Sequence, residues 1–208
     1  MPCDDCISEA IQDGDDDPLE VICFHNASES DVTGQLRVRR FDGATKRLKL
    51  FVLGRTWVDA HNIPRGSIFG HSGLPNVLTV GAVDANDPGN DTIEFFSSRG
   101  PARIDFPGVR LEDKPDVVAV DGVRVSGAGD FPRTFYGTSA SAPHVAAVAA
   151  LVRQKFPAVS NQRLRDLLLN HSVDLGAPGR DLTYGSGRVD ARAAYGALIG
   201  SVLVPIIS

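Results

Sequence analysis

A serine placed directly in front of a strongly apolar segment is the residue of this chain best suited to chemistry. Gly137-Thr138-Ser139 precedes residues 145–152, all of which are Ala, Val or Leu. A helix without a polar face is typical of a protein core. Ser139 at its start would lie beside free backbone N–H groups, which can hold the oxyanion formed when a serine attacks a carbonyl. From these residues alone, a Thr or Ser that merely caps a buried helix is the alternative.

The wider segment narrows that choice. The string G-T-S-A-S-A-P-H-V-A resembles the nucleophile motif of the subtilisin-like serine peptidases (subtilases), with Ser139 in the place of their nucleophilic serine. The resemblance implies that Ser139, its backbone N–H and the turn formed by Gly137 and Thr138 make up the serine loop. One departure is Ala147, where the family usually has Gly. The alanine adds a methyl group at a position where the helix makes a close contact in the family.

Four further segments resemble subtilase motifs and follow the order of that family. They are residues 76–84, 94–101, 114–123 and 184–191, so the similarity runs from about residue 63 to residue 198. Val120-Asp121 replaces the usual proline of the third segment. The resemblance implies an α/β fold: the C-terminal half of a subtilisin-like, mostly parallel sheet with flanking helices.

Two of the elements that must support the serine can also be predicted from residue patterns. The short β-branched run within 76–84, ended by glycine, predicts a buried strand. Ser160 is a suitable N-cap for a helix over 160–169, in which Leu164, Leu167 and Leu168 form a one-sided apolar stripe.

The first 60 residues read differently, as a β-rich insertion or module behind an acidic N-terminal loop. Three strand-like runs, at 19–24, 34–41 and 46–53, are separated by turn residues, and Asp42-Gly43 predicts a hairpin between the last two. We therefore divide the chain into this module (1–60), the C-terminal part of a subtilase catalytic domain (61–200) and a tail (201–208).

Composition restricts the partners. A net charge of −5 and a pI near 5.5 argue against a nucleic-acid surface, and no apolar run is long enough for a membrane span. The acidic run at 13–17 lacks the spacing of a calcium loop, so we name no cofactor and no metal ligand, although calcium is common in the family. Cys3, Cys6 and Cys23 are a weak zinc or redox signal; a disulfide or ordinary thiols are expected.

A serine nucleophile needs a base and an acid, and the sequence offers neither convincingly. None of the five histidines stands in the H-G-T context of the family, and the oxyanion asparagine is not identifiable. His144 is about 140° around the helix from Ser139, which leaves His71 as the remaining candidate. We expect the chain to begin inside the catalytic domain, after the Asp, His and Asn, and to be inactive and aggregation-prone in isolation.

The function implied by the resemblance is that of a serine endopeptidase, which cleaves peptide bonds of proteins or peptides through an acyl-enzyme on Ser139. The missing N-terminal half of the catalytic domain is the expected partner. An extracellular or cell-envelope location follows from the family alone, since no signal peptide is present. The alternative is a non-catalytic binding or structural module. An α/β-hydrolase elbow needs G-x-S-x-G, whose fifth position is Ser141 here.

Overall fold

The computed structural model describes residues 8, 19–40, 42–52, 58–105 and 107–202, and the side chains of these residues up to 197. The chain divides into two compact units, Met1–Leu48 and Lys49–Ser208. Each unit is described by itself.

The strands expected in the N-terminal region do not form among its described residues, and this corrects the sequence interpretation. Residues 19–40 and 42–52 contain only bends, at 28–30 and 42–43. Asp42 Oδ1 accepts a hydrogen bond from Gly43 N, but no strand pair flanks this turn. The apolar side chains remain exposed, for example Val38 at 70%. Without a covering layer, an isolated hairpin gains too little burial to be stable.

The cysteines and the acidic run belong to this region as well. Cys23 is a free, exposed thiol. Cys3, Cys6 and the acidic run at 13–17 lie outside the described residues.

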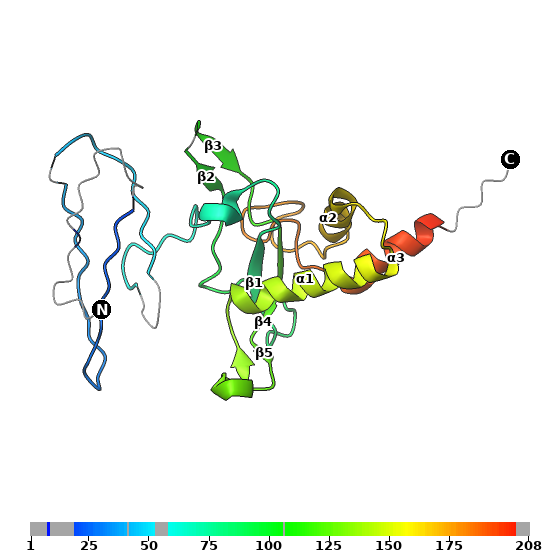
Figure 1. Cartoon of the computed structure of the whole chain (residues 1–208), viewed down its shortest axis with the longest axis horizontal. Helices are drawn as coiled ribbons and strands as arrows, with labels where there is room; N and C mark the ends of the chain where they lie inside the picture. The colour runs from blue at the N-terminus through cyan, green and yellow to red at the C-terminus, as the bar shows by residue number, and fades with distance from the viewer. Residues whose placement is uncertain (1–7, 9–18, 41, 53–57, 106, 203–208) are drawn as a thin grey trace. The chain divides into compact units, whose positions relative to one another are not determined.

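A parallel strand pair forms the centre of the second unit (Figure 1). Strand β1 (Val80–Asp84) pairs with β4 (Val117–Asp121) in parallel, from Val80 opposite Val117 to Asp84 opposite Asp121. The buried strand predicted near residue 80 is therefore confirmed. Smaller elements surround the pair: η1 (Gly70–Gly73), β2 (Ala102–Ile104), β3 (Arg110–Glu112), β5 (Val123–Arg124), η2 (Ala128–Asp130) and β6 (Thr134–Phe135), with β2–β3 and β5–β6 antiparallel.

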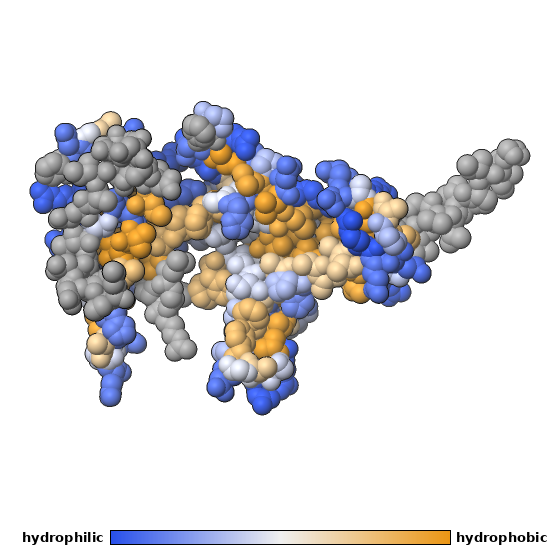
Figure 2. All heavy atoms as spheres, in the orientation of Figure 1, coloured by the Kyte–Doolittle hydropathy of each residue, from blue (hydrophilic) through white to orange (hydrophobic). Residues whose placement is uncertain are grey.

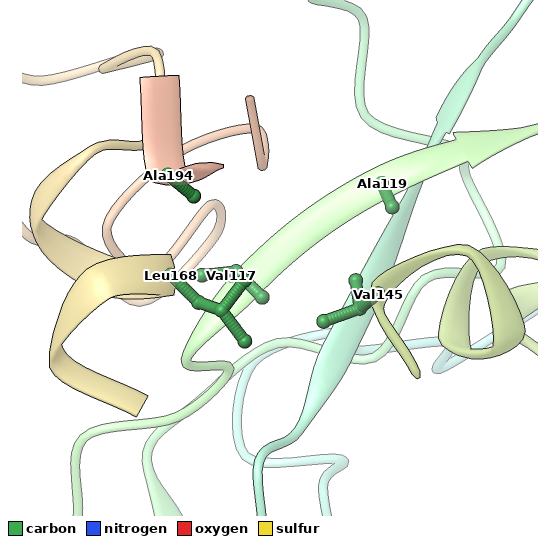
Figure 3. Packing of buried hydrophobic residues seen from close by; sticks show 5 residues of the cluster. All are labelled: Val117, Ala119, Val145, Leu168 and Ala194. Carbon is green, nitrogen blue, oxygen red and sulfur yellow. The ribbon is translucent and has the colours of Figure 1, made fainter. Parts of the chain in front are cut away.

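Three helices complete this unit: α1 (Thr138–Lys155), α2 (Asn161–Asn170) and α3 (Ala191–Val202). Their apolar side chains meet those of β4 in one cluster, shown in Figure 3, which consists of Val117, Ala119, Val145, Leu168 and Ala194. Helices packed on a parallel strand pair make an α/β arrangement, as expected.

The prediction for α2 is confirmed in detail. Ser160 Oγ accepts a hydrogen bond from Arg163 N at 3.1 Å, which makes Ser160 the N-cap. Leu167 and Leu168 are buried, so the apolar stripe does face the core. His171 ends the helix as its C-cap.

Helix α1 departs from the expectation that it would be buried on all sides. Val145 and Val152 are buried, but Ala146, Ala147 and Leu151 are exposed, Leu151 at 55%. Two strands of five residues each can cover only one side of an 18-residue helix. Figure 2 shows apolar side chains gathered along α1. Ala147, where the family usually has Gly, is exposed.

The motif at 184–187 has a steric basis in the loop before α3. Val173 and Arg188 exchange backbone hydrogen bonds of 2.8 and 2.9 Å across Gly187. Gly187 has φ +104°, and a Cβ there would lie 2.0 Å from the carbonyl oxygen of Val173. Only glycine fits this position.

Within the described part of the chain, none of the helices has the length and apolar character needed to cross a membrane.

Candidate active site

The carboxyl ends of β1 and β4 define one edge of the second unit, and the serine segment returns to it. Asp84 and Asp121 end the two strands opposite each other. After β4 the chain runs through β5, η2 and β6 to Gly137, whose N–H donates to Asp121 Oδ2 at 2.7 Å. Helix α1 therefore begins at the edge of a parallel sheet where α/β proteins commonly place their sites.

Ser139 lies in the first turn of α1 and is exposed. Gly137 is the N-cap, with φ +113° and ψ 159°, a conformation that side-chain-bearing residues rarely adopt. The N–H groups of Ala140 and Ser141 donate to Gly137 O, at 2.8 and 3.3 Å. The N–H groups of Thr138 and Ser139 make no hydrogen bond to a described residue. Two donors at the positive helix end thus remain free beside the hydroxyl group.

The capping alternative can be tested against this geometry. No side chain caps α1, whereas Ser160 caps α2 by a side-chain hydrogen bond. Thr138 and Ser139 therefore do not serve as helix caps.

A second serine lies two residues further along. Ser141 is fully buried, and its Oγ has no hydrogen-bond partner among the described residues. Of these two hydroxyl groups, only that of Ser139 is open to a substrate.

No histidine of the second unit is bonded to Ser139. His144 Nδ1 pairs with Ala140 O at 2.7 Å, so its ring is held against the helix backbone. His71 lies in η1, beside β2, and is exposed. His61 lies in a bend, and His171 is the C-cap of α2. Ser139 has no side-chain hydrogen bond to any described residue, so these residues assemble no base.

Acidic groups lie beneath the serine segment instead. Asp121 is fully buried, and its Oδ1 accepts no hydrogen bond from the described residues. Burial raises the pKa of Glu94, and the charge and hydrogen-bonding contact of Asp121 raise it further, with a contribution from Asp84. Sequence reasoning missed Asp121, treating it only as a replacement for proline. Its position as the last residue of a buried strand was the available signal.

The raised pKa of Glu94 predicts how stability depends on pH. The folded state holds the Glu94 proton more tightly than the unfolded state, so this stabilisation is complete below the ordinary pKa and is lost as pH rises through the raised one. Glu94→Gln mimics the protonated group and should raise the free energy of unfolding at pH 8 but not at pH 4. Urea unfolding at the two pH values measures this. An equal change in the free energy of unfolding at pH 4 and pH 8 would contradict this prediction.

In the described part of the chain, no group of three or more His, Cys, Asp or Glu side chains is arranged to hold a metal ion.

Comparison with known proteins places the chain in a family. The profile of the subtilase family matches residues 59–187. The chain belongs to the subtilase family. It is 37% identical over 129 residues to alkaline elastase YaB of Bacillus sp. (strain YaB), covering 60% of this chain and 29% of that protein. It is 30% identical over 115 residues to minor extracellular protease Epr of Bacillus subtilis (strain 168), covering 55% and 16%.

Among solved structures, the subtilisin-like protease Apa1 of Pseudoalteromonas sp. AS-11 shares 38% identity over 35% of this chain and 16% of its own, with a TM-score of 0.32. The family profile and the two relatives identify a serine peptidase at the level of the family. The chain spans less than a third of alkaline elastase YaB.

Proposed function

We propose that this subtilase chain is the serine-bearing part of an endopeptidase that hydrolyses peptide bonds of proteins or peptides. The observation that carries the proposal is the exposed Ser139 beside two free N–H groups at the start of α1. Ser139 Oγ attacks the scissile carbonyl, and the Ser139 N–H, in the loop of Gly137 and Thr138, stabilises the oxyanion. Loss of the amine leaves an acyl-enzyme, which water hydrolyses.

The base, the acid and the oxyanion asparagine come, in this proposal, from another part of the catalytic domain. Ser139 must lose its proton as it attacks, and the leaving amine must gain one, so a nearby base is required. His144, the histidine nearest in sequence, is bonded to a backbone carbonyl instead. The small share of alkaline elastase YaB that the chain spans is consistent with a second catalytic segment.

The exposed face of α1 is where we place that segment. Ala146, Ala147, Ala150 and Leu151 present a continuous apolar surface to solvent. Covering it would remove apolar area from water and bring the added segment to the helix that carries Ser139. In isolation this exposed apolar surface promotes association, so we propose that the chain alone aggregates. Because it lacks a base for Ser139, we also propose that the chain alone is inactive.

The proposed location is extracellular or in the cell envelope. A relative named as an extracellular protease supports it.

The test starts with the DNA upstream of the Met1 codon. We expect an in-frame continuation that carries an Asp, a His and an Asn in subtilase contexts. The product of the whole reading frame, treated with a fluorophosphonate and mapped by mass spectrometry, should carry the adduct on Ser139. A stop codon directly upstream together with an unlabelled protein would overturn the proposal and favour a non-catalytic binding module.

A further inference from the structure

Asp121 is a buried charged group that the proposed reaction does not use. It is 0% exposed and lies at the end of β4. Its Oδ2 receives the N–H of Gly137 at 2.7 Å, two residues before Ser139. Its Oδ1 is buried and has no hydrogen-bond donor among the described residues. Such an oxygen is costly to leave unpaired, so this position favours a proton donor.

The groups around Asp121 identify that donor. Asp84, opposite it on β1, is itself acidic, and its Oδ1 already accepts hydrogen bonds from Asn86. The ring of Tyr136 lies against Gly122, next to Asp121. No salt bridge to Asp121 is formed within the described residues. At the positive end of α1, the N–H of Gly137 donates to Asp121.

Glu94 can supply the proton. Its backbone N–H donates to Ala82 O at 2.9 Å, which fixes the residue beside β1. Burial raises the pKa of its carboxyl group, and the charge and hydrogen-bonding contact of Asp121 raise that pKa further. A protonated Glu94 can donate its O–H to Asp121 Oδ1 and leave Oδ2 for Gly137.

We propose that Asp121 is a positioning residue, which shares a proton with Glu94 and holds Gly137 so that the loop presents Ser139 for attack. This inference rests on the proposed role of Ser139. As pH rises through the pKa of Glu94, three carboxylates face one another at this edge, and their repulsion weakens the hold on Gly137.

The first test reads the hydrogen bond itself and needs no catalysis. In ¹H–¹⁵N spectra of the product of the whole reading frame, the Gly137 amide shift should titrate with a midpoint above the ordinary pKa of Glu. In Glu94→Gln the shift should stay constant, because glutamine donates at every pH. In the near-isosteric Asp121→Asn the Gly137 amide proton should move upfield, since a neutral oxygen is the weaker acceptor. A Gly137 amide that titrates identically in wild type and Glu94→Gln overturns the proposal.

The second test connects the pair to the serine. In the labelled enzyme, Asp121→Asn should slow fluorophosphonate labelling about ten- to a hundredfold, the usual weight of a charge-assisted hydrogen bond. The KM for substrate should stay unchanged in this variant. If the labelling rate of the wild type falls as pH rises through the pKa of Glu94, that fall should be absent in Glu94→Gln. Unchanged labelling in Asp121→Asn refutes the positioning role. Absence of labelling in the wild type refutes the proposed function instead, and the spectra still test the shared proton.

Discussion

Replacing Asp116 by alanine is expected to cost about 3–5 kcal/mol of the free energy of unfolding, the usual result of removing one partner of a buried ion pair. Its carboxylate is 1% exposed and bonds three cations: Lys114 at 2.7 Å, Arg165 at 2.5 Å and Arg180 at 3.1 Å. It also accepts the N–H of Thr79 at 2.7 Å. Without it, the Lys114 ammonium, 2% exposed, keeps among the described residues only the carbonyl of Val77 as a hydrogen-bond partner.

Two control variants separate charge from packing and from surface effects. Asp116→Asn keeps an acceptor for Thr79 but loses the charge, so its loss of stability should be large, although smaller than that of alanine. Asp105→Ala removes the exposed pair with Arg103 and should cost less than about 1 kcal/mol. Urea unfolding of the three variants measures the difference. A similar small loss for Asp105→Ala and Asp116→Ala would show that the buried network contributes little.

This network also marks a limit of prediction from sequence. The segment 114–123 resembles a subtilase motif, but the arginine partners of Asp116 stand 49 and 64 residues later and carry no local signal. Local signals did identify β1, the N-cap Ser160 and the apolar stripe of α2. Each depends on residues a few positions apart, where periodicity and capping act.

The predictions of N-terminal strands and of a fully buried α1 were wrong for a common physical reason. Alternating side chains at 34–40 satisfy the strand pattern, yet a strand forms only where a partner and a covering layer exist. Likewise, the apolar composition of α1 indicates that burying all its faces is favourable. It does not indicate which segment of the protein packs on them. For the site, Ser139 followed from its motif, whereas Asp121 depends on the return of the chain from β6 to the end of β4.

In the enzyme that the fluorophosphonate labels, Ser139→Ala is expected to lower kcat by about 10⁶-fold, as removal of the nucleophile does in a complete Ser-His-Asp triad. KM should change little, because the hydroxyl group forms its bond to the carbonyl only along the reaction path. The free energy of unfolding should also stay nearly constant, since Ser139 is exposed and its side chain makes no hydrogen bond to a described residue. Steady-state hydrolysis of a peptide substrate and urea unfolding measure these quantities.

Ser141→Ala is the matched control, because it removes the same hydroxyl group two positions along the same helix. Ser141 Oγ is buried and unpaired among the described residues, so its loss removes an unsatisfied group and should leave kcat within a fewfold of wild type. If both variants lost activity equally, the helix start and not the nucleophile would be responsible. If Ser139→Ala kept its activity, the attacking oxygen would have to come from another residue. A loss confined to Ser139→Ala would assign the attack to the exposed serine, since burial already excludes Ser141 from contact with a substrate.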